Sequence, residues 1–245
     1  MTRTLHELTH VDAPAWPGLE SMFAGSPTPV VVVPAEEPST ADQILETFQV
    51  SVASPLGAIV WNAGAVVIDD GWLTLVGSGT TTIPAAEQRT FRGGESGPAF
   101  VAVLCAYDAV GGLFAVHGWG FPEADPGEIL YWAPDSLDWQ GLGMPHSTFV
   151  EFVLSPGLDT FYTDLRWQGW RNEVSALKPG EGMLLYPPPS TVEGQDIAAV
   201  SKTAVPITEL HAFAGDASEA YVTPDPESGL EPSRGLRGFL RRRRD

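Results

Sequence analysis

The sequence predicts an α+β fold: a mostly antiparallel sheet, with short helices at the N-terminus and after the central strands. β-Branched and aromatic runs fill the middle of the chain, and turns rich in Asn, Asp and Gly separate them. After Pro134 the apolar residues recur at helical spacing. Strands in the middle with helices at both ends are typical of the α+β class.

The N-terminal third begins with helical patterns. Residues 5–24 predict one or two short helices, with Asp12 as an N-cap whose side-chain oxygen accepts from free backbone N–H groups. Residues 30–33 are four valines and predict a short apolar strand. Ser39 or Thr40 then caps a further helix.

Four short runs further along predict an antiparallel meander. They are residues 49–52, 58–61, 66–68 and 73–76. The gaps contain Pro, Asn, Asp and Gly, and such short gaps are hairpin signals. Residues 77–97 are polar and rich in turn residues, which predicts a long loop. Three more runs continue the sheet: residues 100–105, 113–117 and 129–133.

Three groups of apolar residues after Pro134 predict three short helices, because their members are three or four positions apart. The groups are Phe149, Phe152 and Val153; Leu158, Phe161, Tyr162 and Leu165; and Trp167, Trp170, Val174 and Leu177. Residues 184–186 and 205–213 are predicted to return as strands. We expect one α+β domain over residues 1–214 and a disordered tail over residues 215–245, acidic at first and then rich in arginine.

Charge is distributed unevenly and restricts the class of partner. The net charge is −18, yet six of the 13 basic residues lie in the tail. Residues 1–233 therefore hold seven basic and 30 acidic side chains, a net charge of −23. Contacts to nucleic-acid phosphates need Lys and Arg, so we expect no nucleic-acid binding by the folded body.

Cysteine use and apolar runs predict a cytoplasmic protein. The chain has one cysteine, Cys105, so no intrachain disulfide can form, which fits a reducing compartment. The N-terminus lacks an apolar run of signal-peptide length. No run approaches the roughly 18 apolar residues of a membrane span. No segment has the spacing of a metal site or phosphate loop, and we expect no cofactor.

Several motifs in combination resemble a bacterial family, domain of unknown function 2625 (DUF2625). The motifs are SPLGAIVWNAG, IDDGWLTLVGSG, DAVGGLFAVHG, GEILYWAPDSLDWQGLG and DTFYTDLRWQGW. The resemblance covers roughly residues 5–210 and leaves the tail outside. Since the family has no established activity, it implies no catalytic residues.

A more distant likeness is to the Smi1/Knr4 (SUKH) superfamily, although the usual N-terminal Leu-Pro motif of that superfamily is missing. The matching residues are Gly111, Gly112, Phe114, Tyr131, Asp135, Phe149 and Phe152. This likeness implies a non-catalytic α+β binding module, a class that includes many immunity proteins against toxins.

The tryptophan-rich stretch supplies the candidate binding residues. Core burial is the default role for a tryptophan, since each removes on the order of 150–250 Å² from water. Trp167 and Trp170 lie three positions apart beside Arg166 and Arg171. Aromatic residues and arginine are enriched among the residues that anchor protein interfaces. We therefore place a possible binding face at these four residues.

Other polar residues are better explained by structure than by chemistry. Asp69-Asp70-Gly71 predicts a tight turn, and adjacent residues on a strand would point to opposite faces unless the backbone turns. Cys105 has apolar neighbours, which predicts an inert buried thiol. His117 reads as a core or surface histidine. The alternative is an acid–base pair of His117 with Asp108 or Asp135, which requires the fold to bring the two residues within hydrogen-bond reach.

The sequence thus favours a non-enzymatic protein-binding module, immunity-like by resemblance, whose partner is a basic protein. A small-molecule enzyme using the His117 and Asp135 pair is the alternative. A third hypothesis is membrane contact through the arginine-rich tail, at about 1 kcal/mol per arginine on an anionic surface. Folding of the tail onto the acidic body competes with that hypothesis.

Overall fold

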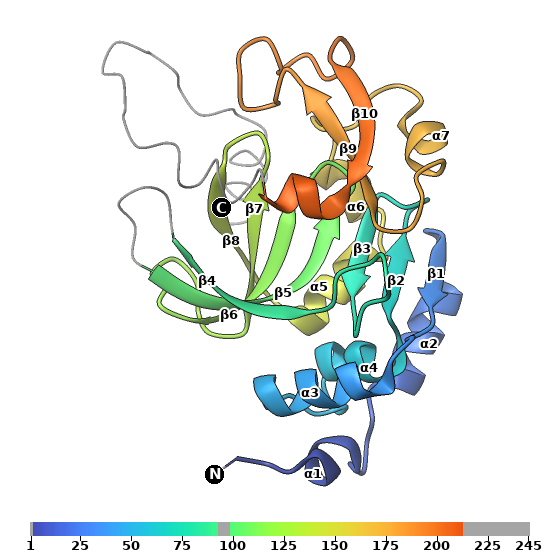
Figure 1. The fold of residues 1–245 in the computed structure, drawn as a ribbon, viewed down its shortest axis with the longest axis vertical. Helices are drawn as coiled ribbons and strands as arrows, with labels where there is room; N and C mark the ends of the chain where they lie inside the picture. The colour runs from blue at the N-terminus through green and yellow to red at the C-terminus, as the bar shows by residue number, and fades with distance from the viewer. Residues whose placement is uncertain (1, 93–98, 213–245) are drawn as a thin grey trace.

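The computed structural model describes residues 2–92 and 99–212 and has the predicted α+β class (Figure 1). Eight strands form one antiparallel sheet in the order β1-β2-β3-β5-β6-β7-β8, with β4 paired to β5 beside that path. Its strands are β1 (Val30–Val33), β2 (Ala65–Ile68), β3 (Leu73–Val76), β4 (Glu87–Arg92), β5 (Ala99–Asp108), β6 (Leu113–Trp119), β7 (Glu128–Ala133) and β8 (Asp138–Pro145). A two-stranded sheet joins β9 (Glu181–Tyr186) and β10 (Ser201–Pro206).

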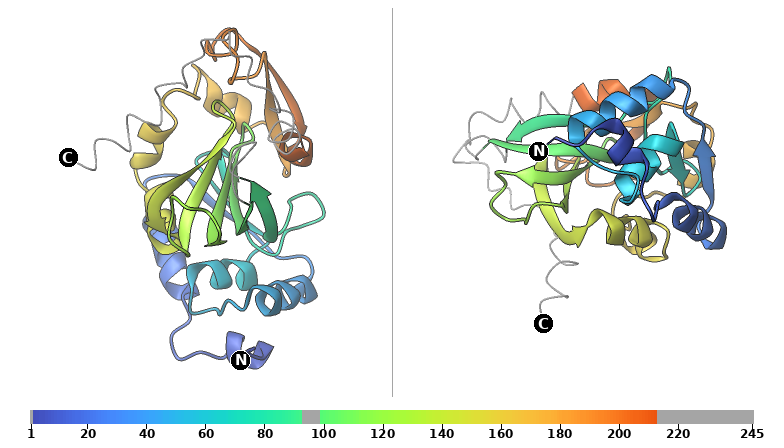
Figure 2. Two further views of the ribbon diagram at one scale, coloured as in Figure 1. Left: turned by 90° about the vertical axis from the view of Figure 1, so that its left-hand side faces the viewer. Right: turned by 90° about the horizontal axis from the view of Figure 1, so that it is seen from below.

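Short helices surround this sheet. They are α1 (Leu5–Thr9), α2 (Trp16–Gly25), α3 (Pro38–Phe48), α4 (Pro55–Asn62), α5 (His146–Val153), α6 (Gly157–Phe161) and α7 (Trp170–Val174). Helices α1 to α4 gather at one end of the molecule, and β9 and β10 lie at the other (Figures 1 and 2). Helix α4 packs against β2, β3 and α5, while α5 also contacts β7 and β8. Over the described residues, no helix has the length and apolar character needed to cross a membrane.

Strand β5 organises the large sheet because it pairs along both edges. On one edge, its first half (residues 99–104) pairs with β4, and its last residues (106–108) pair with β3. On the other edge it pairs with β6, with register shifts near Val101 and Leu104. The strand therefore joins the β1-β2-β3 part of the sheet to the β6-β7-β8 meander.

The strands predicted at residues 30–33, 66–68, 73–76, 100–105, 113–117 and 129–133 are confirmed, as are the three helices after the sheet. The strand predicted at residues 58–61 is wrong, because these residues lie in α4. Ser54 caps that helix by accepting the Gly57 N–H at 3.1 Å, and Pro55 follows at the first position. Residues 56–60 are all buried, so the helical period cannot be read from polarity.

Other differences have local causes. Residues 49–52 form no strand, since Gln49 ends α3 in the left-handed region. The predicted loop over residues 77–97 contains the polar strand β4, and β8 was not predicted. Asp12 caps no helix, because Thr4 caps α1 and Ala15 precedes α2. Residues 201–206 form β10, after which the chain is helical to Ala212 rather than extended. The predicted tail, residues 215–245, lies outside the described residues.

His146, the first residue of α5, makes the fold sensitive to acid. Neither ring nitrogen has a hydrogen-bond partner among the described residues, and burial lowers the pKa of the imidazole to about 4. The unfolded chain, with a pKa near 6.5, binds a proton more readily. The stability that neutral, buried His146 contributes to the fold is therefore present above about pH 6.5 and is lost as the pH falls toward 4.

Replacing His146 with leucine should remove that sensitivity. Between pH 7.5 and 4.5 the wild-type chain is expected to lose about 2.5 kcal/mol of unfolding free energy relative to His146→Leu. Urea titrations at a series of pH values measure the difference. His6→Leu, at an exposed histidine, is the matched control and should run parallel to wild type. Parallel curves for wild type and His146→Leu would contradict the assignment.

Candidate functional site

The turn between β2 and β3 places two carboxylates side by side. Asp69 and Asp70 both have φ of +55°, and Gly71 follows with φ of +95°. Aspartate tolerates this left-handed conformation better than most residues. The predicted turn is therefore confirmed, and it turns the backbone so that both side chains reach one partner. Arg171 Nη1 donates to Asp69 Oδ1 at 2.6 Å and to Asp70 Oδ2 at 2.7 Å.

Arg166 is the buried centre of the site. Its Nη2 donates to Asp69 at 2.5 Å, and its Nη1 donates to Asp159 at 2.6 Å. Only 7% of its side chain is exposed. Burial lowers the pKa of this guanidinium, while the neighbouring Asp69 carboxylate opposes that change. We call Asp69, Asp70, Asp159, Arg166 and Arg171 the arginine–aspartate cluster.

Aromatic rings enclose the cluster on its inner side. The Arg166 guanidinium carbon lies 4.0 Å from the Trp170 ring centre and 4.7 Å from that of Trp72. The Arg171 carbon lies 4.5 Å from the Trp170 ring centre. Burial alone would lower the pKa of Arg171, but hydrogen bonds to Asp70 and Asp69 raise it overall. Both guanidinium groups are therefore held by carboxylates and by cation–π contacts.

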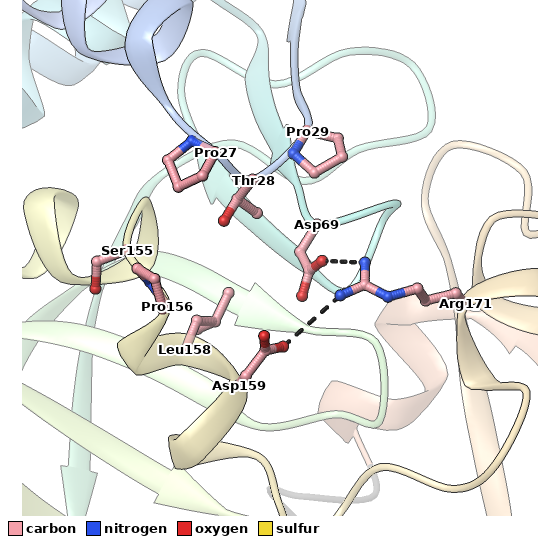
Figure 3. Close-up of a pocket in the computed structure, with 9 residues that line it drawn as sticks. All are labelled: Pro27, Thr28, Pro29, Asp69, Ser155, Pro156, Leu158, Asp159 and Arg171. Atoms are coloured by element: carbon pink, nitrogen blue, oxygen red, sulfur yellow. Dashed lines mark hydrogen bonds and ion pairs between the residues drawn. The ribbon is translucent and has the colours of Figure 1, made fainter.

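A pocket opens beside the cluster, with a volume of about 340 Å³. Four parts of the chain line it: residues 27–29 before β1, Asp69 in the β2–β3 turn, residues 155–159 at the start of α6, and Arg171 in α7. The lining residues are Pro27, Thr28, Pro29, Asp69, Ser155, Pro156, Leu158, Asp159 and Arg171. Figure 3 shows Arg171 reaching between Asp69 and Asp159, the latter at 3.7 Å. The Asp159 side chain is 66% exposed, so the cluster is accessible from the pocket side.

The four residues predicted as a binding face come together here, but in different environments. Trp170 is partly buried between the two arginines, whereas Arg171 is 47% exposed. Trp167 is only 6% exposed, and its Nε1 donates to Glu173 at 3.0 Å. Of the other tryptophans in the stretch, Trp132 and Trp139 are buried and Trp119 is 65% exposed. The stretch is thus mostly core, with Trp170 at the site.

His117 and Asp135 are not brought together. In the register of β6 and β7, Val116 pairs with Ile129 and Leu113 with Trp132, so Asp135 follows the end of β7 that is remote from His117. His117 is buried, and its Nε2 accepts the backbone N–H of Phe121 at 3.0 Å. Cys105 is fully buried, and burial raises the pKa of its thiol, which disfavours the reactive thiolate.

A second polar cluster, which sequence reasoning missed, lies in the core around Asp108. Its Oδ2 accepts the hydroxyls of Tyr131 and Tyr162, each at 3.0 Å, and its Oδ1 accepts the backbone N–H groups of Val110 and Gly112. Burial raises the pKa of the carboxyl, and these hydrogen bonds oppose the shift.

Gly112 marks this second cluster in the sequence. A Cβ at this position would lie 2.1 Å from Asp108 Oδ2 and 2.7 Å from the Tyr131 hydroxyl. The two glycines of the β5–β6 turn were the available signal, because such pairs indicate a close approach of the backbone to another group.

Within the described ranges, no three His, Cys, Asp or Glu residues are arranged to hold a metal ion. Both carboxylate oxygens of Asp108 accept hydrogen bonds, and the residue is not accessible to solvent. We therefore assign the cluster to stability rather than to ligand binding.

Comparisons with known proteins identify the family. The chain is 34% identical over 188 residues to the uncharacterized protein YbfG of Escherichia coli K12, covering 76% of this chain and 84% of the relative. It is 30% identical over 190 residues to an uncharacterized protein of Haemophilus influenzae, covering 76% and 82%. No solved structure matches. The model of the family described as protein of unknown function DUF2625 matches residues 5–210, and the chain belongs to that family.

Proposed function

We propose that this chain is a non-enzymatic, cytoplasmic protein-binding module whose partner is a basic protein. The observation that carries the proposal is the arginine–aspartate cluster, where three carboxylates and two guanidinium groups leave an excess of one negative charge beside an open pocket. Two of the seven basic residues in residues 1–233 are already bound there. Acidic groups therefore dominate the remaining charge, which favours and steers a basic partner.

The surroundings of the cluster support this proposal. Trp170 and Arg171 combine an aromatic ring with a partly exposed guanidinium, the residue types enriched at interface anchors. The distant SUKH likeness is consistent with a basic toxin as partner, as for an immunity protein. The alternative of a small-molecule enzyme lacks comparable support, because the strand register separates His117 from Asp135.

The proposal predicts direct, salt-sensitive binding of a basic protein. The full chain is immobilised and exposed to a lysate of its own host, and bound proteins are identified by mass spectrometry. Each candidate is then purified and titrated against the chain between 50 and 200 mM salt. We expect a partner with a high isoelectric point whose affinity falls as salt rises.

The arginine-rich tail provides a necessary control, because it could bind acidic proteins or an anionic membrane by itself. A full-length variant with its six tail arginines (Arg234, Arg237 and Arg241 to Arg244) replaced by glutamine should retain the basic partner. Loss of that partner in the glutamine variant, or recovery of no basic protein by either chain, would contradict the proposed function.

A further inference from the structure

We propose that the pocket beside Asp159 receives one cationic side chain, the lysine or arginine of a protein segment. This inference rests on the proposed function and assigns it to one place on the surface. Figure 3 shows the pocket between the proline-containing segment before β1 and the α5–α6 connection, with the Asp159 carboxylate at its edge.

The walls of the pocket suit the aliphatic stem of such a side chain. Pro27, Pro29, Pro156 and Leu158 supply apolar surface. Lysine and arginine bury their methylene stems against surface of this kind while the charged head stays near water. A volume of about 340 Å³ is at the lower end for small-ligand sites, which fits one side chain rather than a larger ligand.

Asp159 supplies the acceptor for the charged head. Its Oδ1 is bound by Arg166, whereas no hydrogen bond from the described residues reaches its Oδ2. Asp69 also lines the pocket, but Arg171 and Arg166 engage both of its oxygens. Asp159 Oδ2 is therefore the carboxylate oxygen of the pocket that is available to accept a charge-assisted hydrogen bond from a cation.

The same geometry disfavours an anion. Arg171 is the pocket's cation, and its Nη1 is already shared between Asp69 and Asp70. An anion placed there would face the Asp69 and Asp159 carboxylates that line the pocket, whereas a cation would offset the excess negative charge of the cluster. The net negative charge of the cluster therefore favours a cationic ligand over an anionic one.

The site is also held in place before a ligand arrives. Asp159 is fixed through Oδ1 to Arg166, which in turn is held by Asp69 and by the rings of Trp72 and Trp170. A carboxylate that is already oriented loses little conformational freedom on binding, and this lowers the cost of association.

The test uses the full chain and acetylated glycine pentapeptides with one central arginine, lysine or glutamate. Binding is followed by NMR chemical-shift changes of the pocket residues. Arginine and lysine peptides should give saturable shifts, while the glutamate peptide should give none. Asp159→Asn should weaken the cationic peptides about tenfold, the value of one charge-assisted hydrogen bond.

Two further variants distinguish binding in the pocket from a general effect of the protein's negative charge on the peptides. Asp164→Asn removes the same charge from an exposed residue outside the pocket lining and should stay within about twofold of wild type. Thr28→Phe fills the pocket without changing charge and should weaken binding as Asp159→Asn does. Equal weakening by Asp159→Asn and Asp164→Asn, or no saturable shift with either cationic peptide, would overturn the inference.

Failure of the inference and failure of the proposed function give different results. If the basic partner binds Asp159→Asn as tightly as wild type, the pocket is not its site, although the proposed function stands. If the full chain binds no basic protein, the proposed function fails, and the peptide titrations then decide separately whether the pocket accepts a cation.

Discussion

Replacing Asp69 with asparagine is expected to lower the free energy of unfolding by about 3 kcal/mol or more. The reason is the burial of Arg166, whose side chain is 7% exposed and whose Nη2 donates to Asp69 at 2.5 Å. The substitution leaves that guanidinium with Asp159 as its remaining carboxylate. A buried charge that loses one of its two carboxylate partners costs far more than a surface ion pair contributes. Urea unfolding followed by far-ultraviolet circular dichroism measures the loss.

The neighbouring residue offers a matched control. Asp70 has the same φ of +55° and also binds Arg171, but its side chain is 36% exposed. Asparagine tolerates this backbone conformation as aspartate does, so both variants make the same change: each loses the charge and replaces one acceptor oxygen with an NH2 group. Asp70→Asn should cost less than about 1 kcal/mol. Similar losses for the two variants would show that the buried pair does not stabilise the fold as described.

Removing the Asp108 side chain is expected to destabilise the fold by about 4 kcal/mol or more. Asp108→Ala leaves two tyrosine hydroxyls and two backbone N–H groups without their acceptor, in a region where Asp108 itself is 0% exposed. Each unsatisfied buried donor costs about 1–3 kcal/mol. The same urea titration measures the effect.

Asp108→Asn is the comparison that isolates the charge, because its side-chain oxygen can still accept from Val110 and Gly112. It should cost clearly less than Asp108→Ala. Burial raises the pKa of Asp108 in the folded state. The stability that Asp108 contributes is therefore fully present when the pH is below its pKa in the unfolded chain. This stability is lost as the pH rises through its pKa in the folded state. The advantage of wild type over Asp108→Asn should shrink with rising pH; a growing advantage would contradict the assigned direction.

The sequence could predict elements whose polarity has a period, and it failed where burial or pairing removes that period. Helices α5 to α7 follow from such a period, and strand β1 follows from its uninterrupted run of four valines. Helix α4 was mistaken for a strand because residues 56–60 are buried on all sides. Strand β4 was missed because its residues, Glu87–Arg92, are mostly polar and gain their structure by pairing with β5.

The candidate site shows the same limit. Its arginines and Trp170 are predicted as interface anchors from their residue types, whereas Asp69 is predicted only as part of a turn. Their contact joins residues 97 positions apart, which no local pattern reports. Asp108 and Tyr162 meet across 54 positions for the same reason. Such pairs depend on the sheet order, which hairpin signals determine only between consecutive strands.

Strand β5 has a consequence for how the molecule opens. Its residues 99–104 are bonded to β4 and its residues 106–108 to β3, while β6 occupies the opposite edge. Detaching either group of strands requires breaking main-chain hydrogen bonds to this one segment, which is paired along both edges. Solvent should therefore reach its amides only through a cooperative event that dissolves most of the sheet. The β2–β3 turn that carries Asp69 is joined to that strand through β3, so we expect the acidic half of the arginine–aspartate cluster, Asp69 and Asp70, to stay in place until the sheet opens.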